Sequence, residues 1–254
     1  MSIADHASAH TIDPREVQKF ADIAGEWWDP KGKFAPLHRM NPARLAFLRD
    51  EILRHFSRDS GATRRPLAGL SIIDVGCGGG LVTEPMARMG AAVTGLDAAP
   101  EAIDAARDHA SGVCKDIDYR IGTAESVVAE GKDQYDVVLA LEIVEHVADL
   151  NAFIVACASL VKPGGLLIVS TINRTPEAYA FAIVAAERIL RWLPVGSHHY
   201  DKLVKPEELH AALNGLMGLD VRGPYGLVYK PLSGKWETSL DSRINYFMTA
   251  AKSV

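Results

Sequence analysis

The sequence predicts an α/β fold: one doubly wound, mostly parallel sheet of seven strands, with an N-terminal helical cap and an antiparallel hairpin at the C-terminal edge. Three observations support this. Strand-like and helix-like segments alternate regularly after residue 61, which is typical of a parallel sheet covered by helices on both faces. A glycine-rich turn follows the first of these strands, and the tail changes to strand-like pieces separated by Gly and Pro. We expect residues 1–60 to form the tail and cap, and residues 61–254 to form the sheet, as one structural unit.

The composition sets limits on the class of protein. With 254 residues, of which 48% are hydrophobic, the chain can bury the core of one large domain. A net charge of −5 argues against nucleic-acid binding. The three cysteines form no C-x-x-C pair, as expected in a reducing compartment. The N-terminus does not resemble a secretion signal, and no apolar run reaches the roughly 20 residues of a membrane span, so we expect a cytoplasmic protein.

The N-terminal cap contains two predicted helices. The first begins at Asp13-Pro14, with Glu16 completing a capping-box pattern, and the second begins at Asn41-Pro42. Arg44 then falls in the first turn of the second helix, where the helix dipole disfavours a cation. We therefore expect Arg44 to have an anionic partner such as a ligand carboxylate, with solvent exposure as the alternative.

The alternating segments can be assigned by their patterns. A turn is expected at 162–165, and the hairpin is expected from strand-like pieces around Val221 and at 244–248. The predicted parallel strands are 70–75, 92–97, 117–121, 135–141 and 166–170, and the predicted helices among them are 81–89, 100–110 and 150–160.

The glycine turn after the first strand indicates a nucleotide-like ligand. Gly76 and Gly78 match the dinucleotide motif G-x-G-x-x-G, but Leu81 replaces its third glycine. A ligand without a pyrophosphate fits better, and S-adenosylmethionine is the candidate. Asp97, which ends the second strand, would accept hydrogen bonds from the ribose hydroxyls. The alternative is a turn without a ligand, in which Asp97 caps the next helix.

Two further residues lie at predicted strand ends. Glu125 would reach the adenine amino group or lie on the surface as a turn residue. Leu141 would contact the adenosyl group or fill the core.

Glu142, Glu145 and His146 follow the fourth strand at spacings i, i+3 and i+4. A helical turn there would bring all three onto one face. They would hold a divalent cation such as Mg²⁺, which lowers the pKa of a bound phenol. Without a metal, His146 alone could be the general base. The remaining interpretation is a capping glutamate and a hydrogen-bonded structural histidine.

The segment 177–193 is apolar with basic residues among and around it, and it is too short to span a bilayer. It could lie in the membrane interface. A lid over an apolar substrate and an ordinary helix packed on the sheet are the alternatives.

Several motifs together resemble a known family. The glycine turn with Val93–Asp97 resembles the class I S-adenosylmethionine-dependent methyltransferases, whose fold is Rossmann-like. From about Val17 onward, the chain more specifically resembles the bacterial ubiquinone-biosynthesis O-methyltransferases. The motifs that carry this resemblance are Trp27-Trp28-Asp29, His38-Arg39-x-Asn41-Pro42-x-Arg44, Glu142-x-x-Glu145-His146-Val147, Lys162-Pro163-Gly164-Gly165 and Ser170-Thr171-x-Asn173-Arg174.

The resemblance implies O-methylation of phenolic hydroxyls on a polyprenyl catechol and on demethylubiquinol, with S-adenosylmethionine as the methyl donor. Arg44, Gly76, Asp97 and Leu141 match the family's cofactor contacts. Glu142, Glu145 and His146 match the set that binds a divalent cation in related eukaryotic enzymes.

The polyprenyl substrates would explain segment 177–193 as a membrane-touching or tail-covering element on the inner membrane face, where other enzymes of ubiquinone biosynthesis would be partners. Three alternatives remain: a methyltransferase for another small acceptor, a non-catalytic nucleotide-binding scaffold subunit, and an NAD-dependent oxidoreductase, which Leu81 disfavours.

Overall fold

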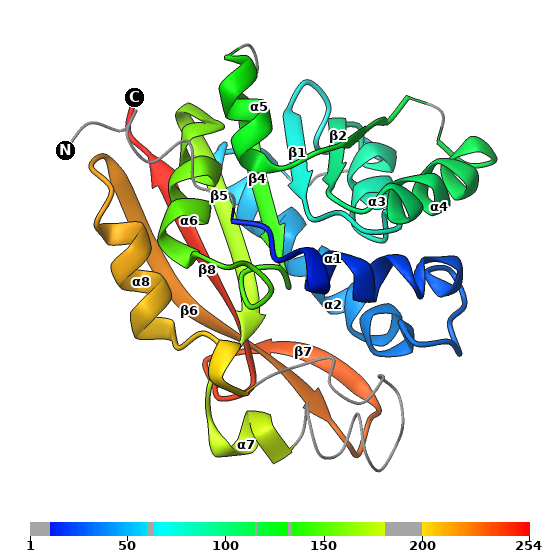
Figure 1. Ribbon diagram of the computed structural model, residues 1–254. Helices are drawn as coiled ribbons and strands as arrows, with labels where there is room; N and C mark the ends of the chain where they lie inside the picture. Colours follow the sequence, from blue (N-terminus) through cyan, green and yellow to red (C-terminus); the bar gives the residue numbers. More distant parts are fainter. Residues whose placement is uncertain (1–10, 60–62, 115, 132–133, 181–199) are drawn as a thin grey trace.

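The computed structural model describes residues 11–59, 63–114, 116–131, 134–180 and 200–254 (Figure 1). Within these ranges the chain forms one eight-stranded sheet in the order β3-β2-β1-β4-β5-β8-β6-β7. The strands are β1 (Ser71–Val75), β2 (Ala92–Asp97), β3 (Asp118–Ile121), β4 (Tyr135–Leu141), β5 (Val161–Ile172), β6 (Leu219–Lys230), β7 (Lys235–Ser239) and β8 (Asn245–Lys252).

The strand directions confirm a mostly parallel, doubly wound sheet. Strands β1 to β5 pair in parallel, and β8 joins them antiparallel to both β5 and β6. The predicted count of seven was one strand too few, because β7 pairs with β6 and forms the edge of the sheet. The last strand, β8, therefore lies inside the sheet rather than at its edge.

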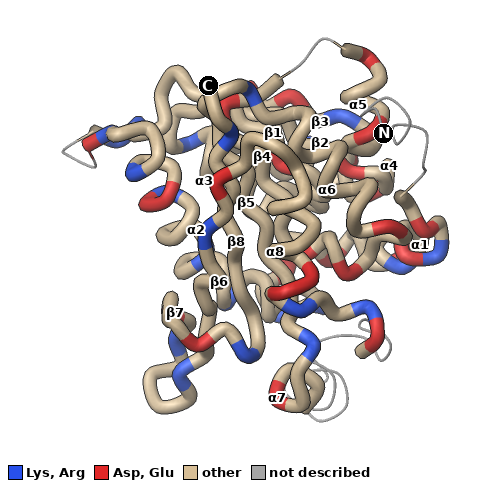
Figure 2. Tube along the Cα trace, turned by 90° about the vertical axis from the view of Figure 1, so that its left-hand side faces the viewer, with Lys and Arg blue, Asp and Glu red and all other residues tan. Residues whose placement is uncertain are grey.

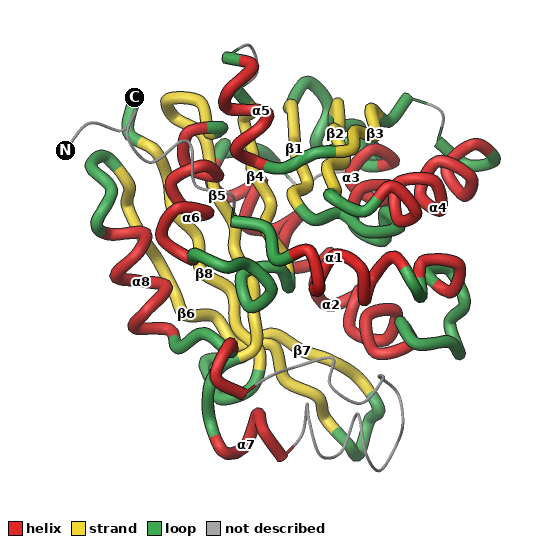
Figure 3. The backbone as a smooth tube through the Cα atoms, in the orientation of Figure 1, coloured by secondary structure: helices red, strands yellow, loops and turns green. Residues whose placement is uncertain are grey.

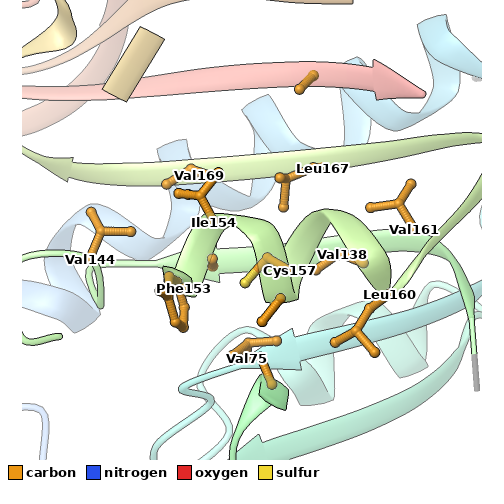
Figure 4. Close-up of a cluster of buried hydrophobic side chains, with 14 of the residues drawn as sticks. Val75, Val138, Val144, Phe153, Ile154, Cys157, Leu160, Val161, Leu167 and Val169 are labelled. Carbon is orange, nitrogen blue, oxygen red and sulfur yellow. The ribbon is translucent and has the colours of Figure 1, made fainter. Parts of the chain in front are cut away.

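Helices cover both faces of the sheet (Figure 1). On one face α6 (Leu150–Ser159) packs on residues that alternate along β4 and β5, such as Val138 and Val169, and Figure 4 shows this cluster. Their neighbours Val137 and Ile168 face the opposite cluster, which includes residues of α2 (Ala35–His55). This alternation is expected for strands buried on both faces. The helices that follow the N-terminal cap are α3 (Thr83–Arg88), α4 (Pro100–Ser111), α5 (Ala124–Glu130), α6 (Leu150–Ser159), α7 (Pro176–Ala178), the short 3₁₀ helix η4 (Tyr200–Lys202) and α8 (Pro206–Asn214).

The N-terminal cap consists of α1 (Pro14–Ala21), the 3₁₀ helix η2 (Ala24–Glu26) and α2 (Ala35–His55). The predicted start of the second helix at Asn41-Pro42 was wrong, because α2 begins earlier and contains Pro42 in its interior. Instead of capping a helix, the Asn41 side chain contacts a residue distant in sequence: its Nδ2 donates to the Leu81 carbonyl at 2.8 Å. Arg44 therefore lies in the middle of a long helix, and the argument from the helix dipole does not apply to it.

The predicted turn at 162–165 lies within β5, where the pairing with β4 shifts register between Tyr135 and Val137. Most of the predicted membrane-facing segment 177–193 lies outside the described residues. In the part of the chain that the structure describes, no helix is long and apolar enough to cross a membrane. The division at residue 60 stays a prediction.

Candidate functional site

A cavity of ≈ 270 Å³ lies at the carboxyl ends of the central parallel strands. Figure 3 shows the loops at these strand ends beside α1. Ligands of open α/β sheets bind at this edge, outside the strand ends. The predicted site residues all line this one cavity, together with residues of the N-terminal cap: Arg44, Gly76, Gly78, Asp97, Glu125, Leu141, Glu142, Glu145 and His146.

The glycine turn after β1 is held by backbone hydrogen bonds to β2. Gly76 N donates to the Leu96 carbonyl at 2.7 Å, and both Gly76 and Gly78 adopt positive φ, 74° and 52°. A Cβ atom at Gly76 would lie 2.2 Å from Ile143 Cδ1, and one at Gly78 would lie 2.3 Å from Trp27 Cζ2. These glycines therefore allow two side chains of the cavity wall to approach the turn.

Asp97 connects the second strand to this turn. Its Oδ2 accepts from Gly78 N at 2.8 Å, and its Oδ1 accepts from Ala99 N at 2.9 Å. Burial raises the pKa of Asp97, while these backbone hydrogen bonds lower it. Each carboxylate oxygen can accept more than one hydrogen bond, so the helix-start contact and a ribose contact are compatible.

Arg44 is 3% exposed and lines the cavity. Its Nε and Nη2 donate to Asn41 Oδ1 at 3.1 and 2.8 Å. Burial lowers its pKa, and the negative charges of Glu142 and Asp74 raise it. Asp74 is the second-to-last residue of β1, and its carboxylate accepts a hydrogen bond from Thr83 Oγ1 at 2.7 Å. Burial raises the pKa of Asp74 to about 6. The expected anionic environment of Arg44 thus contains two acids of the chain itself.

Glu142 begins the loop after β4 in the left-handed region, with φ 54°. Its backbone N donates to the Ser170 carbonyl at 2.9 Å, and its Oε1 accepts from Ser170 Oγ at 2.8 Å. Its Oε2 accepts from Asn245 Nδ2 at 3.3 Å. No helix follows at 142–146. The prediction that a helical turn puts all three side chains on one face was therefore wrong.

Glu145 is almost completely buried beside Glu142. Its Oε2 accepts from Thr171 Oγ1 at 2.8 Å, whereas its Oε1 has no hydrogen-bond partner among the described residues. Burial and the negative charge of Glu142 raise the pKa of Glu145 well above its ordinary value. The environment therefore favours the protonated form of Glu145.

His146 belongs to the loop after β4 and faces α1. Its Nδ1 is 3.1 Å from Glu16 Oε2, and the ring of Phe20 meets the imidazole edge-on at 5.0 Å. The hydrogen bond to His146 is the largest cause of a strongly lowered pKa at Glu16, and the bonds from Lys19 and Lys202 also lower it. Glu16 is thus a carboxylate, contacted by cations, that faces the imidazole.

The predicted metal set does not come together. Glu142 is directed to Ser170 and Asn245, Glu145 to Thr171, and His146 to Glu16. Across the described ranges no three His, Cys, Asp or Glu side chains are grouped so that they could hold a metal ion. The donor arrangement in this structure does not fit a divalent cation.

The remaining predicted residues have contacts of their own. Glu125 Oε1 accepts from Thr11 Oγ1, so the acid is tied to the N-terminal segment. Leu141 is 7% exposed; it lines the cavity and also belongs to a core cluster, which combines both expectations for it. Asn173 Nδ2 donates to the Ser242 carbonyl at 2.9 Å and shapes that loop.

Sequence reasoning missed three residues of the site. Glu16 does not complete a capping box, because its oxygens bind His146, Lys19 and Lys202 instead. Trp27 stacks on Phe34 with ring centroids 3.7 Å apart, and its buried Nε1 has no partner among the described residues. Asn245 comes from the last strand. The Trp-Trp motif was the available signal for Trp27, whereas Glu16 stands only in a capping-box pattern, which indicates a helix start, and Asn245 stands in no motif.

Comparisons with known proteins identify the family. The family described as "Methyltransferase domain" matches residues 73–169. The chain is 52% identical over 249 residues to the ubiquinone biosynthesis O-methyltransferase of Caulobacter vibrioides, covering 98% of each chain. It is 51% identical over 244 residues to the protein of the same name from Sinorhizobium medicae, covering 96% of this chain and 97% of that one.

Solved structures agree with the fold. A magnesium protoporphyrin IX methyltransferase from Synechocystis with bound SAM is 17% identical, with a TM-score of 0.59 over 97% of this chain and 100% of that one. The plantazolicin methyltransferase BpumL is 12% identical, with a TM-score of 0.62 over 94% of this chain and 98% of that one. Together with the relatives above, these findings show that the chain is an S-adenosylmethionine-dependent O-methyltransferase and belongs to the ubiquinone biosynthesis O-methyltransferase family.

Proposed function

We propose that this enzyme methylates phenolic hydroxyls of polyprenyl catechol and demethylubiquinol intermediates. The observation that carries the proposal is that the glycine turn and the Glu142–His146 loop line one and the same cavity. A cofactor on the turn and a phenol beside the loop would then be held next to each other, which is the main requirement of a transfer between them. The name of the closely similar relatives supports this substrate class.

Six residues would hold the cofactor: Arg44, Gly76, Gly78, Asp97, Glu125 and Leu141. S-adenosylmethionine supplies the methyl group when it is bound. Two features of the chain fit it: the glycine turn lines the cavity, and the buried indole N–H of Trp27, also at the cavity wall, has no partner among the described residues. Arg44 would attract the cofactor's carboxylate, and Asp97 would accept from the ribose hydroxyls.

His146 would be the general base that takes the phenolic proton while the oxygen gains the methyl group. Glu142 and Glu145 would then line the acceptor side, Glu145 as a neutral carboxylic acid able to donate a hydrogen bond. No step is routed through a metal ion, because the donor set does not fit one.

The partners follow from the same substrates. A polyprenyl tail favours activity at the cytoplasmic face of the inner membrane, near other enzymes of ubiquinone biosynthesis. Nucleic acid is not expected as a partner at a net charge of −5.

The decisive experiment measures methyl transfer from labelled S-adenosylmethionine to a short-chain prenyl catechol, with and without chelator. We expect turnover in both arms. Binding of S-adenosylhomocysteine without turnover of any catechol would favour another acceptor or a scaffold subunit. Activity that disappears with chelator and returns with Mg²⁺ would show that the donor set rearranges around a metal.

His146→Ala tests the base directly. We expect kcat to fall by about 100-fold or more, while the Kd for S-adenosylhomocysteine changes by less than about twofold. His210→Ala, an exposed histidine on α8, is the matched control and should leave both unchanged.

A further inference from the structure

Glu16, on α1, contacts His146 although the two residues are far apart in the sequence. Glu16 Oε2 lies 3.1 Å from His146 Nδ1, and both side chains are largely buried at the wall of the cavity. The other oxygen, Oε1, accepts from Lys19 Nζ at 3.0 Å and from Lys202 Nζ at 3.2 Å. The two oxygens of this carboxylate therefore have different partners: Oε1 binds the two lysine ammonium groups, and Oε2 faces the imidazole.

This arrangement determines which imidazole nitrogen carries the proton. An ionised carboxylate only accepts hydrogen bonds, so His146 Nδ1 must donate to it. In a neutral imidazole, Nε2 is then the proton acceptor. A buried acid that fixes the tautomer and the orientation of a histidine base is a known catalytic device, and its removal lowers turnover without removing the base.

The backbone around the pair holds α1 in place. Ile12 forms a bridge with Val147, and Ala148 N donates to the Thr11 carbonyl at 2.7 Å. On the other side, Phe20 packs edge-on against the imidazole. Figure 2 shows that α1 carries both acidic and basic residues. The start of α1 is thus attached to the residues directly after His146, and Glu16 extends from this anchored segment.

We infer that Glu16 is a positioning residue that holds His146 with Nδ1 protonated and Nε2 as the proton acceptor. The inference rests on the proposed function in that it assumes His146 to be the base. It goes beyond it because it makes α1 part of the catalytic apparatus. The competing interpretation is that Glu16 only anchors α1 to the domain.

The experiment compares kcat, KM and histidine tautomer in matched variants. Glu16→Gln keeps the size of the side chain and removes the charge, and Glu16→Asp keeps the charge on a shorter stem. Glu26→Gln is the control, because Glu26 forms a comparable ion pair with Lys33 at 2.7 Å but is 40% exposed and lies outside the cavity. The tautomer of His146 is read from ¹⁵N chemical shifts of histidine-labelled protein, with His146→Ala used for assignment.

We expect Glu16→Gln to lower kcat by about 10-fold or more, with KM for S-adenosylmethionine within about twofold. Glu16→Asp should recover part of the loss, and Glu26→Gln should behave as wild type. In a His146→Ala background, Glu16→Gln should cause no further loss, because residues that act as a unit are not additive. An equal loss in that background, or a loss confined to thermal stability, would overturn the inference.

The tautomer measurement separates this inference from the proposed function. If wild-type protein methylates no catechol, the proposed function fails. A wild-type Nδ1–H tautomer that is lost in Glu16→Gln would then still support the positioning role. A tautomer that is the same in both proteins would overturn it, whether or not the enzyme is active.

Discussion

The two walls of the cavity are built in different ways. The glycine turn of the proposed cofactor wall is joined to the end of β2 by hydrogen bonds from its backbone N–H groups: Gly76 N donates to the Leu96 carbonyl, and Gly78 N donates to the Asp97 carboxylate. The opposite wall, which would hold the methyl-accepting phenol and is called the acceptor wall, is positioned by side-chain hydrogen bonds. Glu142, Glu145 and His146 are bound by Ser170 and Asn245, by Thr171, and by Glu16, respectively. The glycine turn and Asp97 of the first wall therefore form a local motif, whereas the second wall exists only when distant elements have come together.

The largest expected effect tests the cofactor wall. Asp97→Ala removes the acceptor of two backbone N–H groups, which is also the proposed acceptor of the ribose hydroxyls. We expect the Kd for S-adenosylhomocysteine to rise by about 100-fold or more, measured by isothermal titration. Asp104→Ala, at an exposed position of α4, is the control. An unchanged Kd for S-adenosylhomocysteine in Asp97→Ala would show that Asp97 does not bind the cofactor.

The second variant tests why the turn after β1 needs glycine at position 78: to leave space for the Trp27 ring, or only to adopt positive φ. Ala at Gly78 would clash with the Trp27 ring and would also adopt positive φ. Gly131→Ala has only the second problem, because no atom lies within 4 Å of its Cβ and its φ is +67°. We expect a rise of about 30-fold in Kd for Gly78→Ala and less than about twofold for Gly131→Ala. Equal effects would mean that close packing by Trp27 is unimportant.

The third variant tests the acceptor wall. Asn245→Ala removes the donor to Glu142 Oε2. We expect kcat/KM for the catechol to fall by about 10-fold while the affinity for S-adenosylhomocysteine stays the same. The control is Asn151→Ala at an exposed position of α6. Loss of cofactor affinity in Asn245→Ala would show that the two walls are not independent.

The smallest expected effect is one of pH on stability. Asp74 has a folded-state pKa of about 6 against an ordinary value of 3.8, because it is buried. Between these values the folded state keeps a proton that the unfolded state has lost, so stability falls as pH rises through 6. Relative to Asp74→Asn, the wild type should lose about 1 kcal/mol of unfolding free energy between pH 5 and pH 8. Urea unfolding at both pH values measures this, and a parallel pH dependence of the two proteins would contradict it.

The difference between the walls also explains what the sequence could predict. Gly76, Gly78 and Asp97 belong to a local pattern whose strand ends meet wherever the sheet forms, so their place in the cavity followed from spacing alone. The contacts of Glu16 and Asn245 depend on α1 and on β8, which lies beside β5, and no spacing encodes such contacts. Local rules also misled: Asn41-Pro42 has the pattern of a helix start but lies inside α2, where Asn41 binds Leu81 and Arg44.

The position of β8 has a consequence for biosynthesis. The ribosome makes strands β1 to β5 before the other strands described, and the parallel pairs form among these five strands alone. Strand β8 is made after every other strand described, yet it lies between β5 and β6 and contributes Asn245 to the acceptor wall. A nascent chain can therefore assemble the glycine turn during translation, since folding proceeds from the N-terminus. It can complete the acceptor side only after residues 245–252 have left the exit tunnel.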